Sequence, residues 1–182
     1  MTRTLLYGGT FDPPHIAHVH IPHKAMVSLE FDRVLYVPAN VTPLKEASST
    51  PVNHRLAMLQ LALNGCEWAE ISTIEIERGG QSYTIDTIES LQNEGDELRL
   101  LIGADQWVQF EQWKRWEDII RLANPVIMPR DEFDVCDERL LQIDSLPAVS
   151  SDIRHRIATG DAIDDLVPPK VAAYITQHQL YQ

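Results

Sequence analysis

Short apolar runs alternate along the chain with longer segments in which apolar residues recur at helical spacing. The runs predict strands at residues 4–7, 33–37, 71–76, 98–102 and 126–128. Segments 55–63 and 84–91 predict amphipathic helices, the second with Ser82 and Thr84 as N-caps. This alternation indicates an α/β fold, a doubly wound parallel sheet with helices on both faces, whose ligands bind at the carboxyl ends of the strands near the topological switch.

The last third of the chain departs from this alternation. Residues 131–138 are acidic and loop-like, and residues 150–158 and 168–178 predict two helices, the second opened by a proline pair. Residues 38–53 form a loop too long for a mere connection, which we expect to be mobile and functional, and Lys45 is its lone lysine. Without repeats or low-complexity tracts, we expect one domain over residues 1–182 with a small helical part from about residue 150.

Composition narrows the classes of function. The 182 residues, 44% hydrophobic and 23% charged, are enough for a sizeable core, and no apolar run approaches the length of a bilayer span. The N-terminus lacks a signal peptide, so we expect a cytoplasmic protein with no membrane partner. A net charge of -12 should repel nucleic acid, so any phosphate site must be built locally. Cys66 and Cys136 form no C-x-x-C pair, which argues against a structural zinc.

The stretch GGTFDPPHIAHVHI, which begins at Gly8, lies between a predicted strand and a predicted helix. Gly8 and Gly9 let the backbone turn sharply and bring its N–H groups close to a ligand, and Thr10 adds a hydroxyl. His15 and His18 are three residues apart, so they share one face of the helix. At a helix N-terminus they would meet an anion together with the unpaired N–H groups and the positive end of the dipole. The stretch therefore predicts a phosphate site.

Other sites that glycines and histidines can form fit this stretch less well. It lacks the G-K-[ST] of a Walker loop and the G-x-G-x-x-G of a dinucleotide-binding turn. A zinc site would need His20 and His23, but the four histidines do not share a face and only Asp12 lies near enough to complete a ligand set. We therefore expect no resident metal. An ordinary surface position would be a reasonable explanation for one histidine, but it explains the aligned pair His15 and His18 poorly. Pro22 is expected to kink or interrupt the helix.

Residues 8–18 resemble the [GP]-G-[TS]-F-D-P-x-[HT]-x-G-H signature of the nucleotidyltransferases that transfer an adenylyl or cytidylyl group from a nucleoside triphosphate to a phosphate-bearing acceptor. Four later segments and the C-terminal tail are similar, in the same order, to those of one branch, the bacterial nicotinate-nucleotide adenylyltransferases. The four segments are YVPANVTPLK (36–45), SYTIDTI (82–88), IGADQW (102–107) and SSDIRHRI (150–157).

The resemblance implies a Rossmann-like fold and the transfer of AMP from ATP to nicotinate mononucleotide, which yields nicotinate adenine dinucleotide and pyrophosphate. Mg²⁺ on the phosphates is the implied cofactor. Two alternatives stay open: phosphopantetheine adenylyltransferase, which carries Thr in place of His15 and lacks the SYT segment, and a non-catalytic nucleotide-binding sensor of the same fold. The choice between nicotinate and nicotinamide mononucleotide, and assembly into a homo-oligomer, also stay open.

The resemblance also implies roles for individual residues. The groups expected to act on the phosphates in catalysis are His15, His18, Lys45 and Arg154. The expected ATP-binding residues, of which the second and third also lie near the acceptor's phosphate, are Gly8, Gly9, Thr10, Phe11, Gly103, Asp105, Ser150 and Ser151. The expected pocket for the pyridine ring consists of Tyr83, Thr84 and Trp113. Core packing explains Trp113 almost as well.

The chain departs from the family pattern at a few positions. Ala17 replaces a glycine and adds a methyl group where the helix is expected to approach the nucleotide. Three other motif residues are replaced, at Thr42, Leu44 and Val149. An ordinary surface charge is one interpretation of three arginines outside the motifs, namely Arg78, Arg115 and Arg130.

Overall fold

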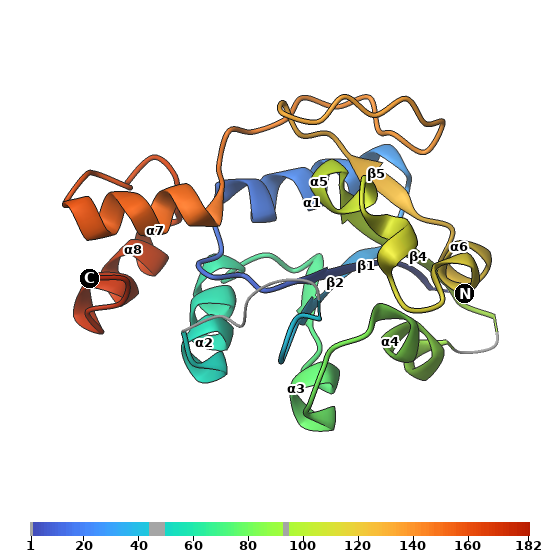
Figure 1. Ribbon diagram of the computed structural model, residues 1–182, viewed down its shortest axis with the longest axis horizontal. Helices are drawn as coiled ribbons and strands as arrows, with labels where there is room; N and C mark the ends of the chain where they lie inside the picture. Colours follow the sequence, from blue (N-terminus) through green and yellow to red (C-terminus); the bar gives the residue numbers. More distant parts are fainter. Residues whose placement is uncertain (1, 44–49, 93–94) are drawn as a thin grey trace.

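The computed structural model describes residues 2–43, 50–92 and 95–182, and these contain a five-stranded parallel sheet (Figure 1). The strands are β1 (Arg3–Gly9), β2 (Arg33–Pro38), β3 (Ala69–Ile71), β4 (Glu97–Gly103) and β5 (Val126–Met128). Their order across the sheet is β3-β2-β1-β4-β5. The chain therefore builds from β1 toward one edge and then returns to the other side of β1 at β4. This makes the sheet doubly wound, with its switch point between β1 and β4.

Helices connect these strands and follow the last one. In the described part of the chain they are α1 (Ile16–Ser28), α2 (Val52–Ala62), α3 (Ile74–Arg78), α4 (Thr84–Leu91), α5 (Ala104–Trp107), the 3-10 helix η1 (Phe110–Gln112), α6 (Trp116–Ala123), α7 (Ser150–Thr159) and α8 (Pro169–Gln177). No described helix has the length and apolar character that a bilayer crossing requires.

The two faces of the sheet pack into separate apolar cores because successive strand residues point to opposite sides. Leu5 and Tyr7 of β1 join α1 in one core. Leu6, between them, joins Ile88 of α4 and Ile119 of α6 in the other core. Burial on both faces explains why β1 is a continuous apolar run rather than an alternating one.

A third apolar core holds the C-terminal helices. Met58 of α2, Ile153 of α7, and Val171 and Ile175 of α8 pack together and are all buried. Figure 1 shows α7 and α8 to one side of the sheet, near α2. Residues between β5 and α7 cross to this side without regular secondary structure beyond isolated bridges. The third core thus places the first turn of α7 beside the carboxyl end of β1.

The predicted doubly wound sheet with helices on both faces is confirmed. Four predicted strands lie where expected, with ends that differ by no more than one or two residues. The predicted strand at residues 71–76 is wrong, because β3 ends at Ile71 and α3 begins at Ile74. The run holds three isoleucines, but it also holds Glu75, which is buried in α3 and accepts a hydrogen bond from the Thr87 hydroxyl of α4 at 2.7 Å. The apolar residues of this run therefore indicate the packing of a short helix rather than a strand.

Pro22 lies inside α1 and does not interrupt it, contrary to one expectation from the sequence. Proline has no N–H to donate to the carbonyl oxygen of His18, four residues earlier. The hydroxyl of Tyr36, on β2, donates to that oxygen at 2.9 Å. Tyr36 is 0% exposed, so this bond lies within the core. The side chain of one element thus supplies the donor that the proline of another lacks, and it fixes the backbone of His18.

Tyr36→Phe should destabilise the fold by about 1–3 kcal/mol, because it leaves the His18 carbonyl without a donor. Pro22→Ala supplies an N–H at the position that can take over this bond. We therefore expect the cost of Tyr36→Phe to fall to less than half in the Pro22→Ala background. Urea unfolding of the four proteins measures both costs. Equal costs in the two backgrounds would show that the hydroxyl does not replace the missing helical bond.

Candidate functional site

Two neighbouring strands, β1 and β4, each finish with glycine at the carboxyl edge of the sheet. Gly8 and Gly9 close β1, and Gly103 closes β4. The register pairs Tyr7 with Leu101, so Gly9 and Gly103 follow two residues later on adjacent strands. The topological switch of a doubly wound sheet is where ligands bind, and glycines there let a ligand approach the backbone.

Phe11, directly after β1, has φ 51, in the left-handed region that bulky side chains rarely adopt. Its buried ring packs edge-on against Tyr7 and His18, with centroid distances of 5.6 and 5.2 Å. A Cβ at Gly9 would lie 2.9 Å from this ring, so glycine is needed for Phe11 to fold back over the strand end. Such backbone strain persists only where surrounding contacts over-determine it.

The N-terminal half of α7 supplies two of those contacts. The Ser150 hydroxyl donates to the carbonyl oxygen of Pro13 at 3.0 Å, and Arg154 Nη1 donates to that of Asp12 at 2.6 Å. These bonds bring the N-terminus of α7 to the β1–α1 loop (residues 10–15). Helix N-termini attract anions through their unpaired N–H groups and dipole. The structure therefore brings Ser150 and Arg154 to the glycine turn, as the sequence prediction requires.

Arg55 of α2 supplies a third contact to the loop. It is 2% exposed, and its Nη1 donates to the carbonyl oxygen of Thr10 at 2.8 Å while Nη2 donates to that of Asn40 at 3.2 Å. Within the described structure its Nε has no hydrogen-bond partner. Burial lowers the pKa of Arg55, and the nearby Asp12 opposes this shift. A buried cation thus joins the chain segments that follow β1 and β2.

The two predicted catalytic histidines lie together at the start of α1. His15 is the N-cap residue, and its ring stacks on that of His18 with centroids 3.6 Å apart and planes 24° from parallel. The His15 backbone N–H donates to His18 Nδ1 at 3.2 Å. A nitrogen that accepts carries no proton, so neutral His18 has its proton on Nε2. The predicted pairing of two imidazoles at a helix N-terminus is confirmed.

His15 is 1% exposed, and its Nδ1 has no hydrogen-bond partner among the described residues. Burial, followed by the charge of Arg130, lowers the pKa of His15 to about 3. His15 is therefore neutral at pH 7 and acts as a hydrogen-bonding dipole rather than as a cation. Arg130 follows β5, and its Nε lies 3.5 Å from Asp105 Oδ1.

The residues predicted to hold the pyridine ring lie around the start of α4. Tyr83 is the N-cap residue and Thr84 begins the helix. Tyr83 and Trp113 are half-buried at the margin of the same apolar core, where the Trp113 ring lies 5.3 Å from that of Phe110. Lys114 Nζ lies 4.6 Å from the centre of the Tyr83 ring. Because Trp113 packs on the core and keeps part of its surface exposed, packing and ring recognition are compatible roles.

The segment before α4 is tied to the end of β2 rather than to its own helix. The prediction of Ser82 and Thr84 as N-caps is wrong, because Tyr83 occupies the cap and no side chain caps the helix. The Ser82 hydroxyl instead accepts the backbone N–H of Asn40 at 2.9 Å. Since the Asn40 carbonyl also accepts from Arg55, one residue links the predicted ring pocket to the β1–α1 loop.

The other predicted residues take up different positions. A Cβ at Gly103 would collide with Asp105 Oδ1, so the glycine lets this carboxylate approach the end of β4. Ser151 is exposed in the first turn of α7. The methyl group of Ala17 is buried in the core beneath α1. Lys45 lies outside the described residues.

Two arginines of the site were missed from the sequence. Arg55 precedes the buried Met58 and Leu59 by three and four residues, so it lies on the apolar face of its helix. A cation on that face was the available sign of a buried arginine. Arg130 is half-buried beside Asp105 and acts on His15, so the structure does not support its interpretation as an ordinary surface charge. Its position just after β5, whose carboxyl end lies beside that of β4, was the signal.

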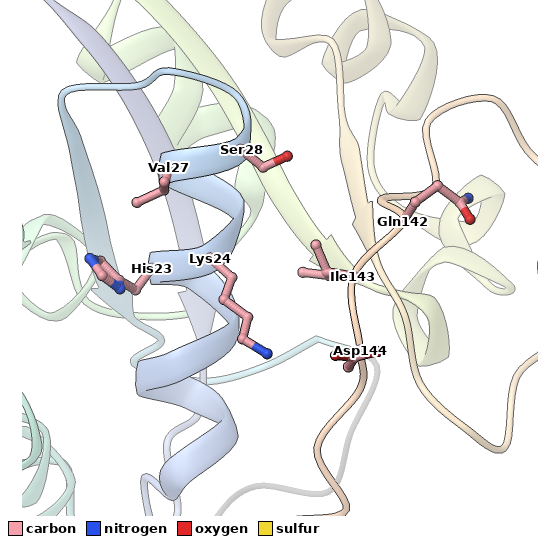
Figure 2. Close-up of a pocket in the computed structure, with 7 residues that line it drawn as sticks. All are labelled: His23, Lys24, Val27, Ser28, Gln142, Ile143 and Asp144. Carbon is pink, nitrogen blue, oxygen red and sulfur yellow. The ribbon is translucent and has the colours of Figure 1, made fainter.

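A surface hollow outside this site lies between α1 and residues 142–144 (Figure 2). Its volume is about 490 Å3, and it contains none of the predicted site residues. In Figure 2 the side chain of Ile143 extends toward α1, and that of Lys24 extends from α1 toward this segment. In the described part of the chain, no group of three or more His, Cys, Asp or Glu side chains could hold a metal ion.

Comparisons with known proteins agree with this arrangement. Residues 6–156 match the cytidylyltransferase-like family. Two relatives named "probable nicotinate-nucleotide adenylyltransferase" are each 38% identical: that of Bordetella pertussis covers 100% of this chain and 99% of its own, and that of Roseiflexus sp. covers 97% and 96%. Among solved structures, Plasmodium falciparum nicotinic acid mononucleotide adenylyltransferase complexed with NaAD has a similar fold. Its TM-score is 0.86 at 20% identity, covering 100% of this chain and 98% of that chain.

The buried neutral state of His15 predicts a specific acid sensitivity. An unfolded histidine titrates near pH 6.5, so between about pH 6.5 and 3 the unfolded chain binds a proton that folded His15 does not. Stability therefore falls as the pH decreases through this window. Relative to His15→Gln, the wild type should lose about 2 kcal/mol between pH 7 and 5. Urea unfolding at both pH values tests this, with His20→Gln, on the exposed face of α1, as the control. Parallel profiles for wild type and His15→Gln would contradict it.

Proposed function

Because the chain belongs to the cytidylyltransferase-like family, and within it to the nicotinate-nucleotide adenylyltransferases, we propose that it transfers AMP from ATP to nicotinate mononucleotide. The products are nicotinate adenine dinucleotide and pyrophosphate. The observation that carries this proposal is the convergence at the end of β1 of two helix N-termini, those of α1 and α7, around the glycine turn and the stacked histidines. Such a site binds a polyphosphate and neutralises its charge.

In this reaction an oxygen of the acceptor's phosphate attacks the α-phosphorus of ATP, and the bond from that phosphorus to the pyrophosphate oxygen breaks. The protein needs no nucleophile, because positioning and charge stabilisation supply most of the rate. His18, with its proton on Nε2, is suited to donate to an α-phosphate oxygen as charge builds there. Neutral His15 holds the His18 ring by stacking.

The departing pyrophosphate needs cations and N–H donors. Arg154 supplies a planar fork of five N–H donors, so its bond to the Asp12 carbonyl leaves donors for phosphate oxygens. Ser150 and Ser151 begin α7, where backbone N–H groups face outward from the helix end. Lys45 is expected to join them, although it lies outside the described residues.

Mg²⁺ fits this site as an ion bound mainly by the triphosphate. Mg²⁺ usually takes one or two carboxylates together with substrate phosphates and water. The nearby carboxylates, Asp12 and Asp105, already engage Tyr181 and Arg130. The ion would neutralise phosphate charge, while the residues of the chain orient the two nucleotides.

The acceptor's ring is proposed to bind at the start of α4. Tyr83 and Trp113 offer aromatic faces, and Thr84 offers a hydroxyl and a backbone N–H in the first turn of the helix. These donors suit the negative carboxylate of nicotinate better than a neutral amide. The link through Asn40 sets this pocket relative to the β1–α1 loop.

Pyrophosphate release from the purified protein tests the proposal. With Mg-ATP, turnover should be fastest with nicotinate mononucleotide, slower with nicotinamide mononucleotide and absent with 4′-phosphopantetheine. Chelation of Mg²⁺ with EDTA should abolish it. A faster reaction with either other acceptor would overturn the choice of substrate. Protein that binds ATP but releases no pyrophosphate with any acceptor would be a nucleotide sensor rather than an enzyme.

His18→Ala should lower kcat by about 10²–10³-fold while the Kd of ATP changes by only a few fold, because the side chain acts on charge that develops in the transition state. His20→Ala, on the same helix but exposed, is the matched control and should leave both constants unchanged. Steady-state kinetics and calorimetric titration with ATP give the two numbers. Equal losses in binding and turnover would assign His18 to ground-state binding alone.

A further inference from the structure

We propose that Tyr181, which follows α8, is a positioning residue for the nucleotide site: its hydroxyl holds the Asp12 carboxylate and so fixes the β1–α1 loop. The inference deepens the proposed adenylyl transfer and rests on it for its effect on turnover. Its effect on the loop and on ATP binding stands apart from the identity of the acceptor.

The contact joins two distant parts of the chain. The Tyr181 hydroxyl donates to Asp12 Oδ1 at 2.6 Å, across 169 residues of sequence. Asp12 is 5% exposed, so the bond lies where water competes weakly. The hydroxyl has a second hydrogen-bond partner in Thr50, just before α2. Burial, followed by the bond to Asp12, raises the pKa of Tyr181, so the hydroxyl stays protonated and remains a donor.

Backbone strain is present at both ends of this contact. Tyr181 has φ 65 and Phe11, beside Asp12, has φ 51. Neither residue is glycine, so each conformation needs support from its surroundings. Leu180 and Tyr181 pack against the third apolar core, which anchors the tyrosine ring. An anchored donor can hold the strained loop, whereas a mobile one could not.

Asp12 is the point at which this support converges. Arg154 holds its carbonyl oxygen and Tyr181 holds its carboxylate, so the C-terminal part of the chain fixes the residue at both backbone and side chain. His15, three residues later, caps α1. Loss of the tyrosine hydroxyl would remove one of the restraints on this carboxylate and weaken its hold away from the bound phosphates, which it repels. Both effects weaken the site without removing any group that touches the nucleotide.

Tyr181→Phe removes only the hydroxyl, and Tyr174→Phe is its matched control. Tyr174, on α8, shares a hydrogen bond with His54 Nδ1 of α2 at 3.0 Å. Each substitution removes a tyrosine hydroxyl bond from the C-terminal part, so both should lower the urea midpoint modestly. We expect Tyr181→Phe to raise the Kd of Mg-ATP about tenfold and to lower kcat/KM by at least as much. Tyr174→Phe should change both by less than about twofold.

Asp12→Asn tests whether Tyr181 acts through the carboxylate. In that background the further substitution Tyr181→Phe should change the Kd of Mg-ATP by less than about threefold, because the charge that the hydroxyl restrains is already gone. Equal Kd values for Tyr181→Phe and Tyr174→Phe would overturn the proposal, as would additive effects of Tyr181→Phe and Asp12→Asn. If the wild type binds Mg-ATP but shows no turnover, the proposed reaction fails, while the Kd values still decide the role of Tyr181.

Discussion

The site depends on a strained loop that cannot hold itself. Phe11 adopts a left-handed conformation over Gly9, and the turn that follows delivers His15 to the start of α1. The contacts that stabilise this loop come from two helices: Arg55 on α2 and Arg154 on α7 each donate a hydrogen bond to a loop carbonyl. The strain is thus balanced by side chains whose own elements belong to the third apolar core, so the helices beside the sheet form the support of the glycine turn.

Charge is arranged by the same logic. The chain carries a net charge of -12, which repels polyphosphate at long range. Against this background, Arg55, Arg130 and Arg154 gather around one strand end. Arg55 is buried and held by carbonyl dipoles, so its field acts through protein rather than through water. A local positive site within an acidic protein suits a compact, highly charged ligand.

The sequence predicted the parts of the molecule that local rules govern. Apolar runs located four of the five strands of the described sheet, and the spacing of His15 and His18 predicted their common face at the helix start. Tertiary contacts decided the rest. Glu75 is buried and hydrogen-bonded to α4, in a short helix that the apolar run predicted as a strand. Arg55 lies on the apolar face of α2 because its hydrogen-bond partners are loop carbonyls that are distant in sequence. No periodic pattern reports such partners, since each bond is set by how elements pack rather than by neighbours in the chain.

The contacts that hold the β1–α1 loop also affect the stage of folding at which the site can form. The bonds from Arg154 and Tyr181 to Asp12 close loops of 142 and 169 residues, among the largest that this chain offers. Loop closure costs conformational entropy before such contacts repay it, so we expect these two bonds to form late in folding. A molecule that has assembled only its sheet would therefore have the glycine turn but no nucleotide site. Nucleotide binding would then stabilise the fully folded state and no partly assembled one.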